Sequence, residues 1–297
     1  MDYLLSIITI NFNGLKETTA LLDSIPFDKD IEIIVVDNAS KEDEATILEN
    51  KYPHITVIRS PQNLGFAGGN NLGYKYSHGK YIFFVNNDTE FHGEWNVSKL
   101  IQRMEENEHI AITCPKIRFF WGSQPIQYAG YTPLSKLTLR NHSIGFGEED
   151  KGQYNSPHPT PYAHGAAMLV RRKAIEQVGP MPECYFLYYE ELDWSMMFTR
   201  MGHEIWYDPS LTLFHKESQT TGQGSPLRSY YVTRNRLLFT QRNNKGPYKY
   251  LSFLYLIFIA GAKEILILTL KREKQLVKAT MTGIYDFLKG KQGYRKF

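Results

Sequence analysis

The chain has 297 residues, of which 42% are hydrophobic and 22% charged, so it is long enough to bury a large core. Its formal charge of +3 is uneven, because the segment from Arg242 to the end holds 12 Lys and Arg against 3 Asp and Glu. The rest of the chain is therefore acidic and carries no basic stripe, which argues against binding to nucleic acid.

The start of the chain and its cysteines both predict a cytoplasmic protein. Residues 1–3 lead directly into a short apolar run, without the basic segment and cleavage site of a signal peptide. That run is better explained as a first β-strand. The two cysteines, Cys114 and Cys184, are too few to indicate a disulfide framework, which fits a reducing compartment.

Apolar, β-branched runs alternate with helical patterns through the first part of the chain. We expect strands at residues 6–10, 31–36, 54–58, 80–85 and 110–114. One helix is expected between the first two strands, and others at residues 66–76 and 95–106. Strands separated by helices predict an α/β domain with a mainly parallel sheet and right-handed crossovers.

Residues 121–162 interrupt this alternation. They are rich in Gly, Pro, Ser and His, and the segment is long enough to be a functional loop or a small insertion. Beyond it we expect strands at residues 166–170, 204–207 and 211–214. A helix is expected at residues 191–201, where Gly202 would end it.

The last part of the chain, residues 226–297, predicts a helical extension after an α/β domain over residues 1–225. Residues 251–270 are apolar and long enough to cross a bilayer, but Lys263 and Glu264 would be costly near its centre. We therefore expect a helix that lies in the plane of an anionic cytoplasmic leaflet, beside the basic end of the chain. The alternative is a soluble helix that packs on the core or in a homo-oligomer.

Small polar residues and glycines follow four of the predicted strands. In open parallel sheets, ligands bind beyond the carboxyl ends of the strands. Here those ends carry Asn11, Asp37, Asp88 and the glycine-rich segment 63–71. Glycines there could let the backbone approach a phosphate. They follow the third strand, whereas a dinucleotide fingerprint would place them after the first.

Asp88 is the best candidate ligand for a divalent cation. Mg²⁺ and Mn²⁺ prefer oxygen ligands, often one or two carboxylates together with substrate phosphates and water. Such a cation would neutralise the charge that grows on a departing nucleoside diphosphate. A lone histidine such as His215 is more often structural, but beside a cation at the sheet edge it could supply a nitrogen ligand.

Three carboxylates, Glu190, Glu191 and Asp193, gather at the start of the predicted helix over residues 191–201. One explanation is the favourable placement of acids against the helix dipole. However, the aromatic run at residues 185–189 is too apolar for a simple solvated turn. Carboxylates close together raise one another's pKa, which suits a general base that takes a proton from an acceptor hydroxyl.

Together these segments resemble the inverting GT-A glycosyltransferases of family 2, especially their bacterial rhamnosyltransferase-like branch. The resemblance covers residues 4–215 and is carried by residues 8–13, 35–40, 63–71, 85–88, 165–169 and 189–194. It implies a Rossmann-like GT-A catalytic domain, a nucleoside diphosphate sugar as donor and Mg²⁺ or Mn²⁺ as cofactor. It also implies transfer to an acceptor hydroxyl with inversion at the anomeric carbon.

The resemblance also implies roles for individual residues. Asp37 would contact the nucleobase or ribose, while Asp88 and His215 would hold the cation. The remaining positions of the nucleotide-sugar pocket would be Thr9, Asn11, Asn63, Gly69, Asn70 and Asn87. Asn86 stands at the first position of the family's Asp-x-Asp-like motif, so this motif provides the cation with one carboxylate rather than two.

Glu191 occupies the position of the family's catalytic base, where Asp is common. Asp193 would support it or bind the acceptor, and alternatively Asp193 or Glu190 takes the proton. Aromatic rings that could stack on the acceptor, or serve only in ordinary packing, are those of Trp121, Tyr128, Tyr131 and Trp194.

The leading hypothesis is transfer from a UDP- or dTDP-sugar, with dTDP-rhamnose a fair guess, in bacterial surface polysaccharide or cell-wall assembly. Membrane association would suit a lipid-linked acceptor. A second hypothesis, motivated by Asn86 and Glu191, is an inactive module that binds a nucleotide-sugar or a glycan. A third is a nucleotidyltransferase, against which the late carboxylate cluster argues.

Overall fold

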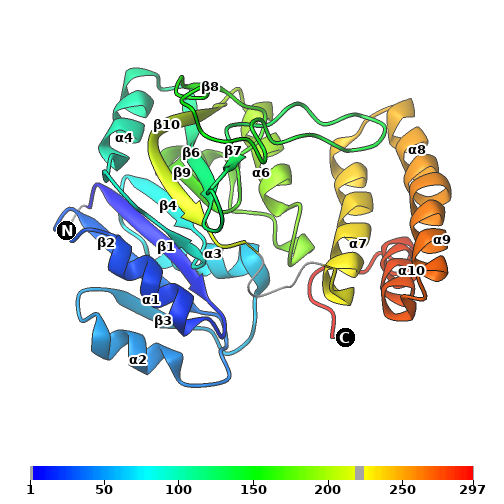
Figure 1. Cartoon of the computed structure of the whole chain (residues 1–297), viewed down its shortest axis with the longest axis horizontal. Helices are drawn as coiled ribbons and strands as arrows, with labels where there is room; N and C mark the ends of the chain where they lie inside the picture. The colour runs from blue at the N-terminus through cyan, green and yellow to red at the C-terminus, as the bar shows by residue number, and fades with distance from the viewer. Residues whose placement is uncertain (1–2, 218–223, 297) are drawn as a thin grey trace.

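The computed structural model describes residues 3–217 and 224–296. Within these residues a single ten-stranded sheet runs in the order β3-β2-β1-β4-β9-β6-β10-β5, with β7 beside β6 and β8 beside β10. Helices lie against it, and a group of C-terminal helices stands at one side (Figure 1). The α/β class and the C-terminal helical extension are therefore confirmed.

The first half of the sheet is parallel, as predicted. It consists of β1 (Leu5–Asn11), β2 (Ile31–Asp37), β3 (Thr56–Arg59) and β4 (Tyr81–Val85). Between them run α1 (Leu15–Ser24), α2 (Glu44–Lys51) and α3 (Gly65–Tyr76). Helix α2 was not predicted, because it buries only Ala45 and Leu48 and so has a weak apolar pattern.

The second half of the sheet departs from the mainly parallel expectation. β9 (Ala167–Arg171) lies antiparallel between β4 and β6 (Ile110–Phe119). The two strands expected at residues 204–207 and 211–214 form one long strand, β10 (Glu204–His215). β10 pairs with β6 and carries an irregularity between Asp208 and Thr212, which explains the break in its apolar pattern.

Short elements complete this half. They are β5 (Thr89–Glu90), α4 (Val97–Glu106), β7 (Ile126–Tyr128), β8 (His158–Pro159), α5 (Arg172–Val178), η1 (Glu183–Tyr185) and α6 (Glu190–Arg200). The segment 121–162 is mostly irregular and contains β7 and β8. It packs its buried side chains, such as Tyr128, against the main core.

The C-terminal helices are α7 (Pro226–Asn243), α8 (Pro247–Leu254), the π-helical η2 (Tyr255–Gly261), α9 (Ala262–Leu270) and α10 (Lys274–Leu288). Helix α7 starts where expected, with Ser225 as its N-cap and Pro226 in its first turn. Two buried apolar clusters join these helices to the segment before α6. One contains Tyr185 and Leu237, and the other Phe186 and Tyr231.

Helices α8, η2 and α9 form one continuous helix, Pro247–Leu270, at the outer edge of the molecule (Figure 1). The helix has 24 residues, and an 18-residue stretch of it has a mean hydropathy of 2.0. It is therefore long and apolar enough to cross a membrane, by length and composition only. Only 11% of that stretch is buried. Large apolar side chains exposed on it are Leu251, Leu254, Phe258, Ile259, Leu266, Ile267 and Leu270.

Candidate active site

A cavity of about 650 Å³ lies beyond the carboxyl ends of β1, β2 and β4. Its walls come from the whole length of the chain. Asn38, Asn63 and Asn70 line one side of it, and Asn87, Asp88 and His215 another. Glu190 and Glu191 face it from α6, while Arg228 and Tyr294 close it from the C-terminal segment. Of the residues expected at this edge of the sheet, Asp88 and the segment 63–71 therefore meet at the cavity.

Asn38 organises the side of the cavity that would hold a nucleotide. Its Nδ2 donates to the Gly65 carbonyl at 3.1 Å and to Asn63 Oδ1 at 3.2 Å, and its Oδ1 accepts from the Leu64 N–H at 2.9 Å. These bonds tie the end of β2 to the start of α3. Asn38 was not among the predicted site residues, although an amide directly after a buried strand was a usable signal.

Asn11 serves a different purpose from the one expected. It is fully buried, and its Nδ2 donates to Asp37 Oδ1 at 3.0 Å and to Glu44 Oε2 at 2.7 Å. Thr18 donates to Asn11 Oδ1 at 2.7 Å. Asn11 therefore links the ends of β1 and β2 to α1 and α2. Neither Asn11 nor Asp37 lines the cavity.

Thr9 and Gly69 also lie outside the cavity lining. Thr9 is only 1% exposed within β1. A Cβ placed on Gly69 would come within 2.8 Å of the Ile10 Cδ1 atom. Gly69 thus allows α3 to pack closely on β1. Its expected contact with the nucleotide-sugar stays a prediction.

Asp88 and His215 meet at the cavity wall. Asp88 Oδ1 lies 3.2 Å from His215 Nε2, and the two side chains are 10% and 8% exposed. His215 Nδ1 contacts Gln127 Oε1 at 2.8 Å, so this nitrogen carries the proton and Nε2 presents a lone pair. Among the described residues no donor hydrogen-bonds Asp88 Oδ1. Two buried acceptors that face one another fit a shared cation.

The spacing agrees with this fit. Two ligands about 2.1 Å from a Mg²⁺-sized cation and at right angles lie about 3 Å apart. In the part of the chain that the structure describes, no third His, Cys, Asp or Glu joins Asp88 and His215 to make a cluster. The rest of a coordination shell would have to come from substrate phosphates and water. Asn87, which lines the cavity beside Asp88, donates from Nδ2 to Thr18 Oγ1 at 3.0 Å.

Glu190 and Glu191 provide two carboxyl groups in the same cavity. Burial raises the pKa of Glu191 to about 6, so its carboxylate is a stronger base than an ordinary Glu at neutral pH. Burial, and then the charge of Glu191, raises the pKa of Glu190 well above its usual range. Glu190 is 2% exposed, and no described residue hydrogen-bonds its Oε2. The pair thus combines one protonated acid with one carboxylate.

Asp193 lies outside the cavity and is fully buried. Its carboxylate accepts from Tyr185 Oη at 3.1 Å, Asn243 Nδ2 at 2.8 Å and Arg242 Nε at 2.5 Å. Both oxygens are therefore engaged in holding α6 to α7. The expected contact of Asp193 with the acceptor, or its service as an alternative base, stays a prediction.

Of the four aromatic residues predicted to stack on the acceptor, one lines the cavity. Tyr128 and Trp194 are buried in the core, and exposed Trp121 lies outside the cavity lining. Tyr131 lines the cavity and stacks on His164 with 5.9 Å between ring centroids. Burial lowers the pKa of His164 to about 3, and its Nδ1 accepts the Ala166 N–H at 3.1 Å. His164 is therefore a neutral side chain with its proton on Nε2.

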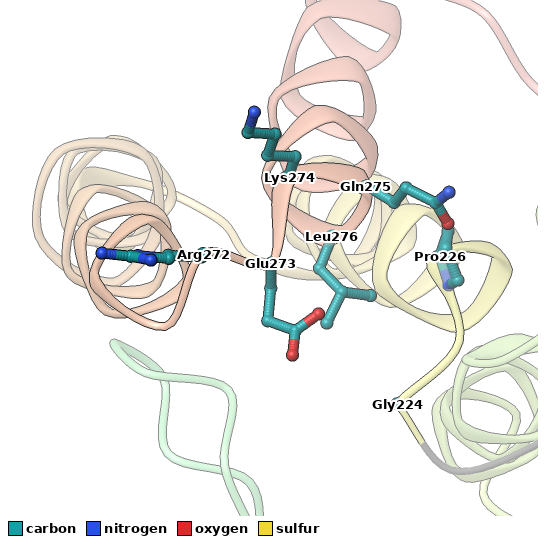
Figure 2. Close-up of a pocket in the computed structure, with 7 residues that line it drawn as sticks. All are labelled: Gly224, Pro226, Arg272, Glu273, Lys274, Gln275 and Leu276. Atoms are coloured by element: carbon teal, nitrogen blue, oxygen red, sulfur yellow. The ribbon is translucent and has the colours of Figure 1, made fainter.

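A second, smaller hollow lies between the start of α7 and the turn from α9 to α10. Its volume is about 320 Å³, and it shares no lining residue with the first cavity. Figure 2 shows Glu273 and Leu276 turned toward it and Lys274 turned away. Among the described residues that line it, Glu273 alone has a carboxyl group and none is a histidine. The first cavity has clustered carboxylates and a histidine, and it is therefore the candidate active site.

The comparison with family models decides the identity. The model described as glycosyl transferase family 2 matches residues 6–179, more than half of the chain. The chain belongs to glycosyl transferase family 2. It is a glycosyltransferase by membership, and its matched segment contains Asn38, Asn63, Asn70 and Asp88 of the cavity.

Curated relatives carry glycosyltransferase names. A low-salt glycan biosynthesis hexosyltransferase, Agl10 of Haloferax volcanii, is 28% identical over 84% of this chain and 81% of its own length. The dTDP-rhamnosyl transferase RfbF of Shigella flexneri is 25% identical over 96% of both chains. An N-acetylglucosaminyl-diphospho-decaprenol L-rhamnosyltransferase of Mycobacterium tuberculosis is 23% identical over 67% of this chain and 71% of its own length.

Solved structures confirm the GT-A-like fold of this family 2 chain. GalNAc-T7 with UDP, GalNAc and Mn²⁺ gives a TM-score of 0.63 at 15% identity, and the match covers 86% of this chain but only 56% of that enzyme. The mannosyltransferase PcManGT of Pyrobaculum calidifontis, with GDP-Man and Mn²⁺, gives 0.59 at 12% identity over 97% of this chain and 88% of its own. Likenesses this remote in sequence show the fold alone.

Proposed function

We propose that this glycosyltransferase moves a sugar from a nucleoside diphosphate donor to an acceptor hydroxyl, with inversion at the anomeric carbon. The observation that carries the proposal is that one cavity contains the Asp88–His215 pair and the Glu190–Glu191 pair. The first pair could hold a cation that stabilises the negative charge on the leaving diphosphate. The second pair could remove the proton from the attacking hydroxyl. A displacement of this kind requires both.

Asp88 and His215 would hold the divalent cation, Mg²⁺ or Mn²⁺. When bound, the cation would neutralise the charge that develops on the departing nucleoside diphosphate. Asn38, Asn63 and Asn70 would bound the donor pocket, while buried Asn11 shapes it from behind. Asp37, which accepts from Asn11 where β1 and β2 end, and Thr9 within β1 would belong to the same side of the site.

Glu191 would act as the base. Its carboxylate takes the proton of the acceptor hydroxyl while the acceptor oxygen forms a bond to the anomeric carbon. The bond from that carbon to the diphosphate oxygen breaks on the opposite face, which inverts the configuration. Glu190, protonated, would remain a hydrogen-bond donor beside it. Tyr131 and Tyr294 are two of the aromatic rings in the cavity lining that could contact the acceptor.

The donor that relatives favour is dTDP-rhamnose, with a UDP-sugar as the alternative. RfbF is named for dTDP-rhamnosyl transfer, and the mycobacterial relative for rhamnosyl transfer to a diphospho-decaprenol-linked sugar. A glycan or lipid-linked acceptor in surface polysaccharide or cell-wall assembly follows by analogy. The test is transfer of isotopically labelled sugar from each donor into membrane extract. Retention of nucleotide binding without any transfer or hydrolysis would instead support an inactive binding module.

Peripheral contact with the cytoplasmic face of the membrane completes the proposal. The helix Pro247–Leu270 exposes its apolar side chains, and basic residues follow it, among them Lys271, Arg272, Lys274 and Lys278. A surface of this composition suits an anionic bilayer. The protein should co-float with vesicles that contain anionic lipid and lose binding in Phe258→Glu. If the wild-type protein is a monomer in solution and does not float with the vesicles, both membrane contact and a homo-oligomer through this face are contradicted.

A further inference from the structure

The chain takes an unusual path just before the carboxylate pair. Phe186, Tyr188 and Tyr189 all have positive φ angles, of 70°, 67° and 80°. Bulky residues with a Cβ rarely adopt this left-handed conformation, so it persists only where the surroundings enforce it. We call residues 186–189 the left-handed turn. It ends at Tyr189, the N-cap of α6, and Glu190 and Glu191 follow immediately.

One side chain of α7 holds this turn. Asn235 is fully buried, and its Nδ2 donates to the carbonyls of Tyr185 at 3.0 Å, Leu187 at 2.6 Å and Tyr188 at 3.0 Å. The two protons of this amide group are thus shared among three carbonyl oxygens. The carbonyls of this turn and the left-handed backbone around them thus lie against one side chain.

Arg234 fixes the orientation of that amide. Its Nε donates to Asn235 Oδ1 at 2.9 Å, and its Nη2 donates to the Tyr185 carbonyl at 2.7 Å. The guanidinium is also 1% exposed and reaches the Gly293 carbonyl at 2.7 Å. Because Asn235 Oδ1 is engaged as an acceptor, Nδ2 has to face the turn.

The opposite side of the turn rests on the start of α3. The Phe186 carbonyl accepts the Phe66 N–H at 2.9 Å, and a Cβ on Gly65 would lie 2.2 Å from the same oxygen. Gly65 and Phe66 line the cavity on the donor side. The left-handed turn is therefore fixed between the donor side of the cavity and α7.

We propose that Asn235, oriented by Arg234, is a positioning residue that places Glu191 in the active site by holding the left-handed turn. Asn235 lies outside the cavity lining, so its effect on the reaction would pass through the turn. The inference rests on the proposed role of Glu191 as base. It assigns a catalytic contribution to α7, a helix beyond the segment that the family model matches.

The test compares Asn235→Ala, Asn235→Asp and Asn235→Ser with a matched control, Ser252→Ala. Ser252 is also fully buried, and its Oγ donates to the carbonyls of Lys136 at 2.8 Å and Leu137 at 2.7 Å, away from the cavity. The assay follows release of nucleoside diphosphate from dTDP-rhamnose, UDP-glucose, UDP-N-acetylglucosamine and GDP-mannose in Mn²⁺, with water as acceptor. Asn235→Ser keeps one hydrogen-bond donor, and it replaces Asn235→Ala in the comparison if Asn235→Ala does not fold.

The expected result is a loss of kcat of about tenfold or more in Asn235→Ala, because small displacements of a reacting group are costly. KM for the donor should stay within about threefold, and Asn235→Asp should be more impaired than Asn235→Ala since it turns an acceptor toward three carbonyls. The acidic limb of the kcat–pH profile should move to lower pH, because a displaced Glu191 becomes more exposed. A loss of folded protein alone would leave that limb in place.

Hydrogen exchange provides a readout that does not need activity. Amides of residues 186–191 should exchange about tenfold faster in Asn235→Ala than in Ser252→Ala. Unchanged exchange there, or a kcat and acidic limb equal to those of Ser252→Ala, overturns the inference. If Glu191→Gln keeps the wild-type rate in the same assay, Glu191 is not the base. That conclusion does not depend on the results for the Asn235 variants.

Discussion

Asp88 Oδ1 lies 3.2 Å from His215 Nε2 although the two residues are 127 positions apart. The sheet brings them together in a simple way. Thr89, in the short strand β5, pairs with His215 at the end of β10, and the Lys216 N–H donates to the Asp88 carbonyl at 2.8 Å. The pairing of β5 with β10 therefore places Asp88, which directly precedes β5, beside His215 at the end of β10.

The first prediction concerns this pair and the cation. In wild type, Mn²⁺ with one nucleoside diphosphate should raise the melting temperature, because a ligand of the native state stabilises it by mass action. Asp88→Asn and His215→Ala should each abolish the Mn²⁺-dependent part of that shift. The control is Asp28→Asn, which changes an exposed Asp outside the cavity lining. This variant should retain the Mn²⁺-dependent shift. A full shift in both active-site variants would exclude cation binding here.

The second prediction is the pH dependence of turnover. Glu191 has to be deprotonated to accept the acceptor's proton, and burial raises its pKa to about 6. kcat should therefore be constant above this value and fall tenfold per pH unit below it. An acidic limb near 4.5, the ordinary value for Glu, would contradict the assignment. Glu191→Gln should remove the limb and lower kcat by about 10²–10⁴.

The third prediction is that Asp193 contributes to stability rather than to the reaction. Asp193→Ala leaves Asn243, Arg242 and Tyr185 without their shared acceptor, which should cost about 2–4 kcal/mol in the free energy of unfolding. Glu149→Ala breaks an exposed pair with Lys151 and should cost less than about 1 kcal/mol. Urea unfolding measures both. Equal, small losses would show that the buried network is not needed.

The fourth prediction concerns Gly65, where φ is +72° and an added Cβ would meet the Phe186 carbonyl oxygen. Gly65→Ala should impair both folding stability and nucleotide binding, because backbone atoms of the left-handed turn cannot move aside cheaply. Gly122 has φ +65° with open space around it, so Gly122→Ala should cost only about 1–2 kcal/mol. Calorimetry with and without nucleotide compares them. Identical losses would mean that the close contact at Gly65 has no consequence.

Much of this arrangement was predictable from the sequence. Continuous apolar runs marked the parallel strands, and polar residues after them marked the edge where the cavity lies. The family resemblance placed Asp88, His215 and Glu191, and the structure brings all three to the cavity. The antiparallel course of β9 was not predictable, because a strand buried on both faces has the same apolar pattern in either direction.

The predicted site residues that lie outside the cavity lining have one feature in common. A small polar residue after a strand can face a ligand or bond to its neighbours, and its position along the chain is the same in both cases. Asn11 turned out to bond inward to Asp37 and Glu44, and Asp193 to Arg242 and Asn243. Only tertiary structure reveals these partners, since each lies at least 26 residues away. The role of Asn235 was hidden for the same reason.

The most direct test of the central claim is release of nucleoside diphosphate from a panel of nucleotide-sugars by wild type, Glu191→Gln and Asp88→Asn, with and without Mn²⁺. The account predicts Mn²⁺-dependent release from one class of donor by wild type, and a loss of about 10² or more in each variant. Glu191→Gln should still bind the nucleotide. Wild-type rates in both variants, or binding without any release in wild type, would contradict an active transferase that uses these two residues.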